Sequence, residues 1–269
     1  MDDQKRNGVM MKKALILGIY LFLFCVGFDY ELTNLIIEDY SLNHYLELFY
    51  SLGLLSIYIV PAVFLLHQLA KRVPGSQYLP GLAILTGLFL PGWIAGYGND
   101  YLGSFLANSS WTDAVTAPII EESVKLLCVY LLVYLLNSRG LGKIFIIGIG
   151  VGLGFQIMED ISYIIMGAAD STKEIIPQVV TRIVGSLSSH WAYTGIFSVG
   201  VSCLLMREHY NKKLGVLWTI SPVVLHFLWN SPLNEGANNL LTPILSASTL
   251  LLIIQILRYL KEKDELLLG

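Results

Sequence analysis

The stretch "VTAPIIEESVKLLCVYLLVYLL", from Val115 to Leu136, has the apolar character and the length of a membrane-spanning helix. A bilayer core of about 30 Å needs about 20 such residues in a helix. Three ionisable residues nevertheless lie inside the stretch, at Glu121, Glu122 and Lys125. Ionisable side chains are costly within a membrane, so their presence in a span indicates a functional site.

The composition is that of a helical membrane protein. Hydrophobic residues make up 55% of the 269 residues and charged residues only 14%, whereas soluble domains contain about 45–50% apolar and about 25% charged residues. No linker, low-complexity tract or internal repeat divides the sequence. We therefore predict an all-α polytopic membrane protein in which residues 1–269 form a single integral membrane domain in the lipid bilayer. A net charge of −3 without a basic stripe gives no indication of a nucleic-acid partner.

Eight segments are long and apolar enough to cross the bilayer. The loops between these segments alternate between the two sides of the membrane, and the basic residues lie almost entirely on one side. The positive-inside rule predicts this pattern when the number of spans is correct. Of the 17 lysine and arginine residues, Lys125 lies within a span, only Lys173 and Arg182 fall on the outer side, and all the others fall on the inner side. This sorting predicts eight transmembrane helices with both termini in the cytoplasm. The predicted spans are Ala14–Tyr30, Tyr45–Ala70, Tyr78–Tyr97, Ala114–Leu136, Leu141–Ala168, Val179–Met206, Leu214–Ser231 and Leu241–Leu260.

Four of these spans carry polar residues that membranes disfavour. Besides the charged residues of the fourth span, the fifth has Glu159 and Asp160, the sixth has His190, and the seventh has His226 and Asn230. With a rise of about 1.5 Å per residue, the ionisable groups of all four spans lie roughly 10–17 Å below the outer surface. Four helices from separate parts of the sequence thus bring ionisable groups to one depth, which predicts a shared site in the outer half of the bilayer.

Helical spacing indicates which of these residues share a face. Glu121 and Lys125 are four apart and Glu122 and Lys125 are three apart, so the lysine is expected to neutralise one of the two glutamates. The pair Glu122 and Lys125 suits a structural ion pair as well as a catalytic one. His226 and Asn230 are four apart and are expected to point into one cavity.

Two mechanisms of peptide hydrolysis are open to this cluster. In the first, Glu121 takes a proton from the attacking water, while the histidines and Asn230 donate hydrogen bonds to the oxyanion. In the second, Glu159, His190 and His226 hold a zinc ion, because two histidines and one carboxylate form a common catalytic zinc site, and Glu121 is again the base. The H-E-x-x-H motif is absent, so spacing alone does not choose between them.

The same residues resemble a known family. "EESVK" (Glu121–Lys125) resembles the E-E-x-x-K motif of the PrsW family of intramembrane proteases, and "FQIME" (Phe155–Glu159) resembles its F-x-x-x-E motif. His190 and "HFLWN" (His226–Asn230) resemble its two histidine motifs. This family belongs with the CAAX prenyl endopeptidases and the Abi bacteriocin-immunity proteins, which share a helical core whose glutamates and histidines line a membrane cavity. The resemblance implies a catalytic four-helix core over residues 115–234.

The resemblance also implies a reaction and a place for it. Such an enzyme cleaves a single-span membrane protein, for example an anti-sigma factor, near its outer end in the bacterial plasma membrane. By resemblance, Glu121 is the base, Glu122 its partner and Lys125 part of the same motif. The residues that would bind metal or stabilise the oxyanion are Glu159, His190, His226 and Asn230. Asp160 stands where the family is expected to have asparagine, and we expect it to face a polar loop or to cap a partner rather than to act in catalysis.

Two other functions also use buried glutamates and histidines. A proton- or ion-coupled transporter uses them as relays, but it would spread them through the depth of the membrane and often has an internal repeat. A non-catalytic immunity or binding protein would not require an intact E-E-x-x-K motif. The sequence therefore favours an intramembrane protease, with transport and immunity as the alternatives.

Overall fold

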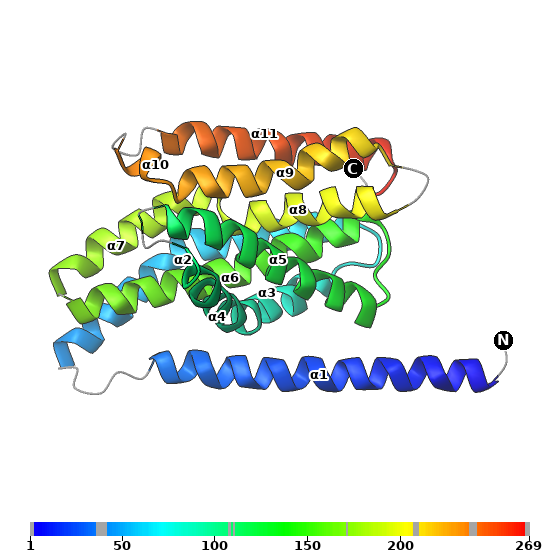
Figure 1. Ribbon diagram of the computed structural model, residues 1–269, viewed down its shortest axis with the longest axis horizontal. Helices are drawn as coiled ribbons and strands as arrows, with labels where there is room; N and C mark the ends of the chain where they lie inside the picture. The colour runs from blue at the N-terminus through cyan, green and yellow to red at the C-terminus, as the bar shows by residue number, and fades with distance from the viewer. Residues whose placement is uncertain are drawn as a thin grey trace.

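The computed structural model is a bundle of helices (Figure 1), with no strand among the residues that it describes, which are 3–35, 42–106, 109, 111–170, 172–206, 210–236 and 241–266. The predicted all-α class is confirmed for these residues. The elements in chain order are α1 (Asp3–Leu35), α2 (Leu42–Lys71), α3 (Leu79–Phe89), α4 (Pro91–Gly103), α5 (Thr112–Leu135), α6 (Leu141–Asp170), α7 (Thr172–Gly185), the short 3-10 helix η1 (Ser186–Ser188), α8 (His190–Leu205), α9 (Lys212–Trp229), α10 (Pro232–Gly236) and α11 (Leu241–Glu262).

Five stretches of the described chain are helical, long and apolar enough to cross a membrane. They coincide with the first, second, third, fifth and eighth predicted spans, and they are Asn7–Asn34, Tyr45–Lys71, Leu79–Gly103, Leu141–Gly167 and Leu241–Glu262. The helices of the other three predicted spans are short or carry charged residues. Three charged residues lie in the middle of α5, α8 has only 16 residues, and α9 begins with two lysines.

Helix α6 is the centre of the bundle. In its most apolar stretch, 94% of the residues are buried, compared with 17% in the corresponding stretches of α2 and α11 and 0% in that of α1. Glycines allow α6 to touch its neighbours backbone to backbone. A Cβ atom at Gly154 would lie 2.1 Å from the carbonyl oxygen of Ile84 on α3, and one at Gly152 would lie 2.3 Å from that of His190 on α8. The small residues of α6 thus fix the distances to α3 and α8.

Two of the predicted spans are interrupted. The third is divided between α3 and α4 at Pro91, because proline has no N–H group to continue the helical hydrogen bonds. The prediction of one continuous helix over Val179–Met206 is wrong, since this segment forms the end of α7, then η1, then α8. The serines between Gly185 and His190 explain this break, because serine hydroxyls compete for backbone hydrogen bonds. Ser186 Oγ donates to the carbonyl of Ile183 at 2.7 Å.

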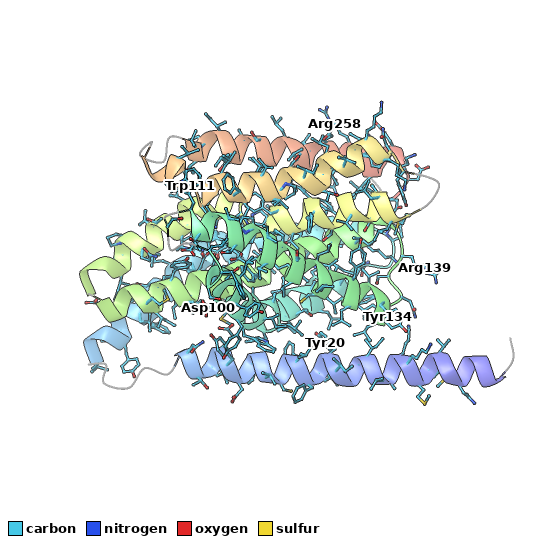
Figure 2. The ribbon with its side chains drawn as sticks, viewed as in Figure 1. Tyr20, Asp100, Trp111, Tyr134, Arg139 and Arg258 are labelled. Carbon is cyan, nitrogen blue, oxygen red and sulfur yellow. The ribbon has the colours of Figure 1, made fainter. Side chains whose placement is uncertain are left out.

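Helix α1 lies along the outside of the bundle (Figure 1). Figure 2 shows Tyr20 on the side of α1 that faces the other helices, where its hydroxyl lies 2.8 Å from Thr86 Oγ1. Phe24 packs edge-on against Phe89 at 5.4 Å. Gly27 is a point of closest approach, because a Cβ there would lie 1.6 Å from the carbonyl oxygen of Phe89. In Figure 1, α1 begins and α11 ends at the same end of the bundle.

Candidate active site

The acidic pair of α5 lies inside the bundle. Glu121 is 7% exposed, and Glu122 and Lys125 are fully buried. Lys125 Nζ lies 2.6 Å from Glu122 Oε1 and 3.6 Å from Glu121 Oε2. The hydroxyl of Thr194 on α8 donates to the other oxygen of Glu122 at 3.1 Å. Lys125 therefore neutralises Glu122, as the spacing predicts, while Glu121 Oε2 has no hydrogen-bond partner in the described structure.

His190 is the first residue of α8, directly after the helix break at Ser189. Its Nδ1 lies 2.9 Å from Lys125 Nζ, and its Nε2 lies 3.2 Å from Glu159 Oε2 on α6. A lysine ammonium can only donate, so Nδ1 accepts from Lys125 and the ring proton is on Nε2, which donates to Glu159. The break between η1 and α8 thus places this imidazole where it bridges α5 and α6.

Helix α9 supplies His226 and Asn230. His226 is 2% exposed, and its ring stacks on Tyr193 of α8 at 5.5 Å with an interplanar angle of 22°. Asn230 follows one turn later as the C-cap of α9. Both residues line one cavity, which confirms the prediction from their spacing.

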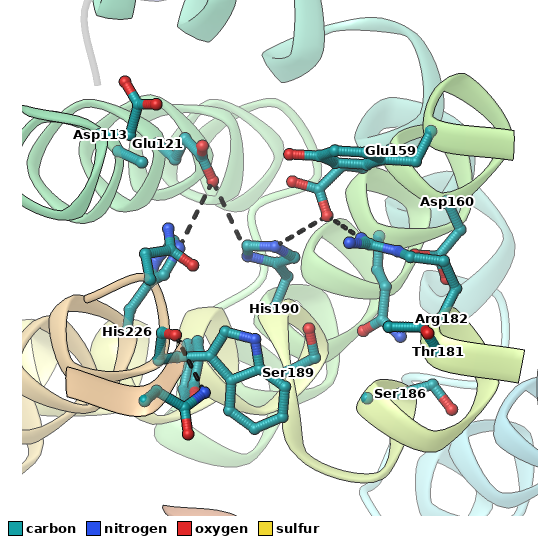
Figure 3. Close-up of a pocket in the computed structure, with 18 of the residues that line it drawn as sticks. Asp113, Glu121, Glu159, Asp160, Thr181, Arg182, Ser186, Ser189, His190 and His226 are labelled. Carbon is teal, nitrogen blue, oxygen red and sulfur yellow. Dashed lines mark hydrogen bonds and ion pairs between the residues drawn. The ribbon is translucent and has the colours of Figure 1, made fainter. Parts of the chain in front are cut away.

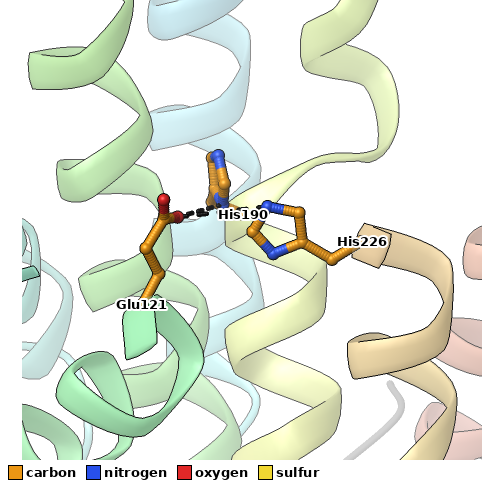
Figure 4. A group of neighbouring side chains, drawn as sticks. All are labelled: Glu121, His190 and His226. Carbon is orange, nitrogen blue, oxygen red and sulfur yellow. Dashed lines mark ion pairs between the residues drawn. The ribbon is translucent and has the colours of Figure 1, made fainter. Parts of the chain in front are cut away.

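Three of the predicted residues from three helices converge (Figure 4). Glu121, His190 and His226 each offer one ligand atom, and these atoms all lie within 4.8 Å of one another. The two imidazole rings are 4.9 Å apart. We call these three residues the Glu–His–His triad. A carboxylate and two imidazoles are the donor set of many catalytic zinc sites.

The surroundings of the triad fit a metal ion. The carboxylate of the triad carries a buried oxygen without a hydrogen-bond partner among the described residues. His190 donates its other ring N–H to a carboxylate, as histidines that bind metals commonly do. The ammonium of Lys125 is close to Nδ1 of the same ring, so a metal ion and the lysine would compete for that nitrogen.

Glu159 lies beside the triad rather than in it. Its Oε2 accepts hydrogen bonds from His190 Nε2 and from the guanidinium of Arg182 on α7. The carboxylate that the structure groups with the two histidines is Glu121, and not Glu159 as in the zinc set predicted from the sequence. Because Arg182 holds Glu159 by charge, Glu159 orients the imidazole of His190.

Arg182 also pairs with Asp160. Its Nε donates to Asp160 Oδ1, and the hydroxyl of Tyr58 on α2 donates to Asp160 Oδ2 at 2.5 Å. The ring of Tyr163 lies 4.5 Å from the guanidinium carbon. Asp160 is 1% exposed, so its charge depends on these two donors. Asp160 faces polar partners, as expected.

The polar groups line a cavity of about 450 Å³, and Figure 3 shows the residues of its wall around the triad. All members of the triad, Glu159 and Asn230 line it. Glu122 and Lys125 do not, because they lie behind Glu121, deeper in the bundle. Of the seven residues predicted for the site, five therefore reach the cavity and two lie behind its wall.

The sequence did not single out three residues of this cavity. Asn99 of α4 donates to Glu121 Oε1 at 3.5 Å, Tyr193 stacks on His226, and Arg182 binds two carboxylates. The sequence placed Arg182 on the outer side, although it lies inside the predicted span Val179–Met206. An arginine within a span is itself a signal of function, and that signal would have found it. Asn99 and Tyr193 have no comparable signal.

Comparison with known proteins identifies a family for this chain. Residues 77–257 match the family described as PrsW family intramembrane metalloprotease. This range begins just before α3, extends into α11 and contains all seven residues predicted for the site. No curated protein and no solved structure matches the chain. Since the match covers well over half of the 269 residues and includes the converging glutamates and histidines, the chain belongs to the PrsW family of intramembrane metalloproteases.

Proposed function

We propose that this protease hydrolyses a peptide bond in a single-span membrane protein, with Glu121 as the base. The observation that carries the proposal is the position of Glu121 Oε2. It is buried beside both histidines, borders the cavity and has no hydrogen-bond partner in the described structure. A carboxylate that is poorly solvated and free to accept is suited to take a proton from water.

The reaction needs one water molecule and one peptide bond. The oxygen of the water attacks the carbonyl carbon while Glu121 Oε2 accepts one of its protons. The C–N bond of the tetrahedral intermediate then breaks, and Glu121 returns the proton to the departing amine. The products are a carboxylic acid end, which keeps the second proton of the water, and an amine end, and Glu121 is restored as the carboxylate.

The rest of the site stabilises and orients these groups. His226 and Asn230 line the cavity beside Glu121, and hydrogen bonds from their side chains would stabilise the oxyanion. His190 keeps a defined orientation because Lys125 and Glu159 bind its two nitrogens. The ion pair of Glu122 with Lys125 leaves no second free carboxylate beside the base.

A metal ion fits the same residues. Glu121, His190 and His226 would hold it, and zinc suits this donor set best. In that case Glu121 would be a ligand instead of the free base, and Lys125 would give up Nδ1 of His190. When bound, it supplies Lewis acidity that polarises the scissile carbonyl.

The setting of the reaction follows from the distribution of charge. The lysine and arginine residues favour eight passages, with both ends of the chain in the cytoplasm and the cavity toward the outer face of a bacterial plasma membrane. The passages form one membrane domain, and residues 115–234 are its catalytic core. An anti-sigma factor with one span is the kind of substrate that such a site would cleave near its outer end.

The test compares the wild type with Glu121→Gln, at equal abundance, by mapping the ends of membrane-protein fragments in cells. Glu47→Gln is the matched control, because Glu47 is an exposed carboxylate on α2. We expect outward-facing cleavage ends with the wild type and with the control, and none with Glu121→Gln. Zinc addition and chelation on the purified protein then show whether cleavage depends on the metal.

Equal cleavage by Glu121→Gln and by the wild type would refute the role of Glu121 as base. Substrate-dependent uptake by proteoliposomes, with no cleavage under any condition, would instead support a transporter.

A further inference from the structure

A second cavity adjoins the active site. It has a volume of about 480 Å³ and lies between α1, α4 and α6. It shares Asn99, Glu121 and Glu159 with the first cavity, so the two meet at the base of the proposed reaction. Helix α1 forms one wall and lies outside the residues that match the family. The walls of this groove therefore come partly from helices within the family match and partly from α1, which lies outside it.

One buried carboxylate in this groove lacks a partner. Glu31 of α1 is only 5% exposed, and no hydrogen bond or ion pair links its side chain to any residue that the structure describes. Its Oε1 rests against α4, where a Cβ at Gly92 would lie 2.9 Å away. A buried carboxylate without a cation or donors is costly, so an occupant that supplies one would be bound favourably.

The other carboxylates of the groove already have cations. Glu159 is bound by Arg182, and Glu121 lies 3.6 Å from Lys125 Nζ, which it shares with Glu122. No basic side chain lines the groove itself among the described residues. A positively charged group that enters the groove would thus find Glu31 as its unoccupied counterion.

The remaining wall suits an aliphatic stem that carries such a charge. Met158 and Ile165 are buried in it, and Met166 is exposed at its edge. Lysine and arginine bury their methylene stems on apolar surface while the charged head pairs with a carboxylate, and methionines adapt their shape to such stems.

We infer that this groove is a substrate-binding subsite in which Glu31 receives a lysine or arginine side chain of the substrate, close to the scissile bond. The inference rests on the proposed protease function and adds a specificity to it. The occupant is an extended stretch of the substrate chain that runs from the groove to Glu121.

The probe is a set of synthetic apolar peptides with a single lysine moved through successive positions, and a matching set with norleucine instead. The purified full-length protein in lipid nanodiscs is assayed as wild type, Glu31→Gln, Glu31→Lys and Asp29→Asn. Asp29 is the matched control, because it is an exposed carboxylate two residues away on α1. The readout is the ratio of cleavage between lysine and norleucine peptides within each variant, which cancels differences in the amount of active protein.

We expect the wild type and Asp29→Asn to prefer lysine at one fixed distance from the cut. Glu31→Gln should reduce that preference at least about tenfold, as loss of one partner of a buried charge pair does. Glu31→Lys should reverse it toward the norleucine peptides. An unchanged lysine preference in Glu31→Gln would overturn the inference and leave the protease function intact.

A second measurement does not depend on cleavage. A photoreactive amino acid at Met166 in the Glu121→Gln protein should capture the lysine peptide more strongly than the norleucine peptide, and Glu31→Gln should abolish the difference. Equal capture with and without Glu31 would refute the subsite. Selective capture together with a wild type that cleaves no peptide would support the subsite and count against the proposed function.

Discussion

Arg182 offers the sharpest test of how the site is held together. Replacement by glutamine leaves Asp160 without its cation, at a position that is 1% exposed. Removal of one partner of a buried ion pair costs about 3–5 kcal/mol. The side chains of Arg182 and Glu159 are 22% and 21% exposed, so water screens part of their interaction. We therefore expect Arg182→Gln to lower the free energy of unfolding by about 3 kcal/mol, the lower end of the range.

A double replacement isolates the pair. Asp160→Asn retains an oxygen that accepts from Tyr58 and leaves Arg182 paired with Glu159, so we expect it to cost about 1 kcal/mol, close to one hydrogen bond. Arg182→Gln with Asp160→Asn should cost about 2 kcal/mol rather than the sum of about 4, because no unpaired aspartate remains. At about 2–4 °C per kcal/mol, the single arginine variant should melt about 6–12 °C below the wild type.

The buried cysteines provide the assay. Cys128 and Cys203 are free and buried, so a thiol-reactive dye reports their exposure as the protein unfolds. Cys25 is exposed and should be replaced by serine in every variant to remove the background. Arg258→Gln, on the exposed side of α11, is the matched control. A melting temperature of Arg182→Gln within about 2 °C of the wild type, or a double variant that equals the sum of the singles, would refute the coupling.

Three further tests address other parts of the site. Lys125→Met leaves Glu122 buried without a cation, so dye-detected melting should show a loss of about 3–5 kcal/mol; a wild-type melting curve would contradict the pairing. Gly152→Ala places a Cβ 2.3 Å from the backbone carbonyl of His190, so both the rate of cleavage and the melting temperature should fall. Gly18→Ala, which has no atom within 4 Å, should change neither. Zinc at about 100 times its dissociation constant should stabilise the wild type by about 2.7 kcal/mol. A variant with alanine for one histidine of the triad should gain much less, and an equal gain would place the metal elsewhere.

The sequence was most informative about residues that are costly to bury and about contacts within a single helix. A glutamate pair within an apolar span stands out because membranes exclude charge, and helical period alone predicts that Lys125 meets Glu122. Counting residues along the predicted spans also placed Glu121, His190 and His226 at a similar depth in the membrane. These inferences need only the rise and the period of a helix, which hold wherever the helix lies in the fold.

The sequence could not decide between two glutamates at similar depth. Glu121 joins the histidines, whereas Glu159 turns to Arg182, and that choice depends on the rotation of α5 and α6 about their axes and on α7. The helix break before His190 was likewise missed, because the serines that explain it lie within a segment long enough for one span.

The sequence by itself thus determined the class of the protein and the residue types of its site, because hydrophobicity and helical spacing are properties of single segments. Its short motifs indicated the family by resemblance. Only the tertiary structure decided which carboxylate completes the triad, why Asp160 is tolerated and where Glu31 lies. Those outcomes depend on contacts between helices that are distant in the chain, and such contacts are set by packing and by the pairing of buried charges.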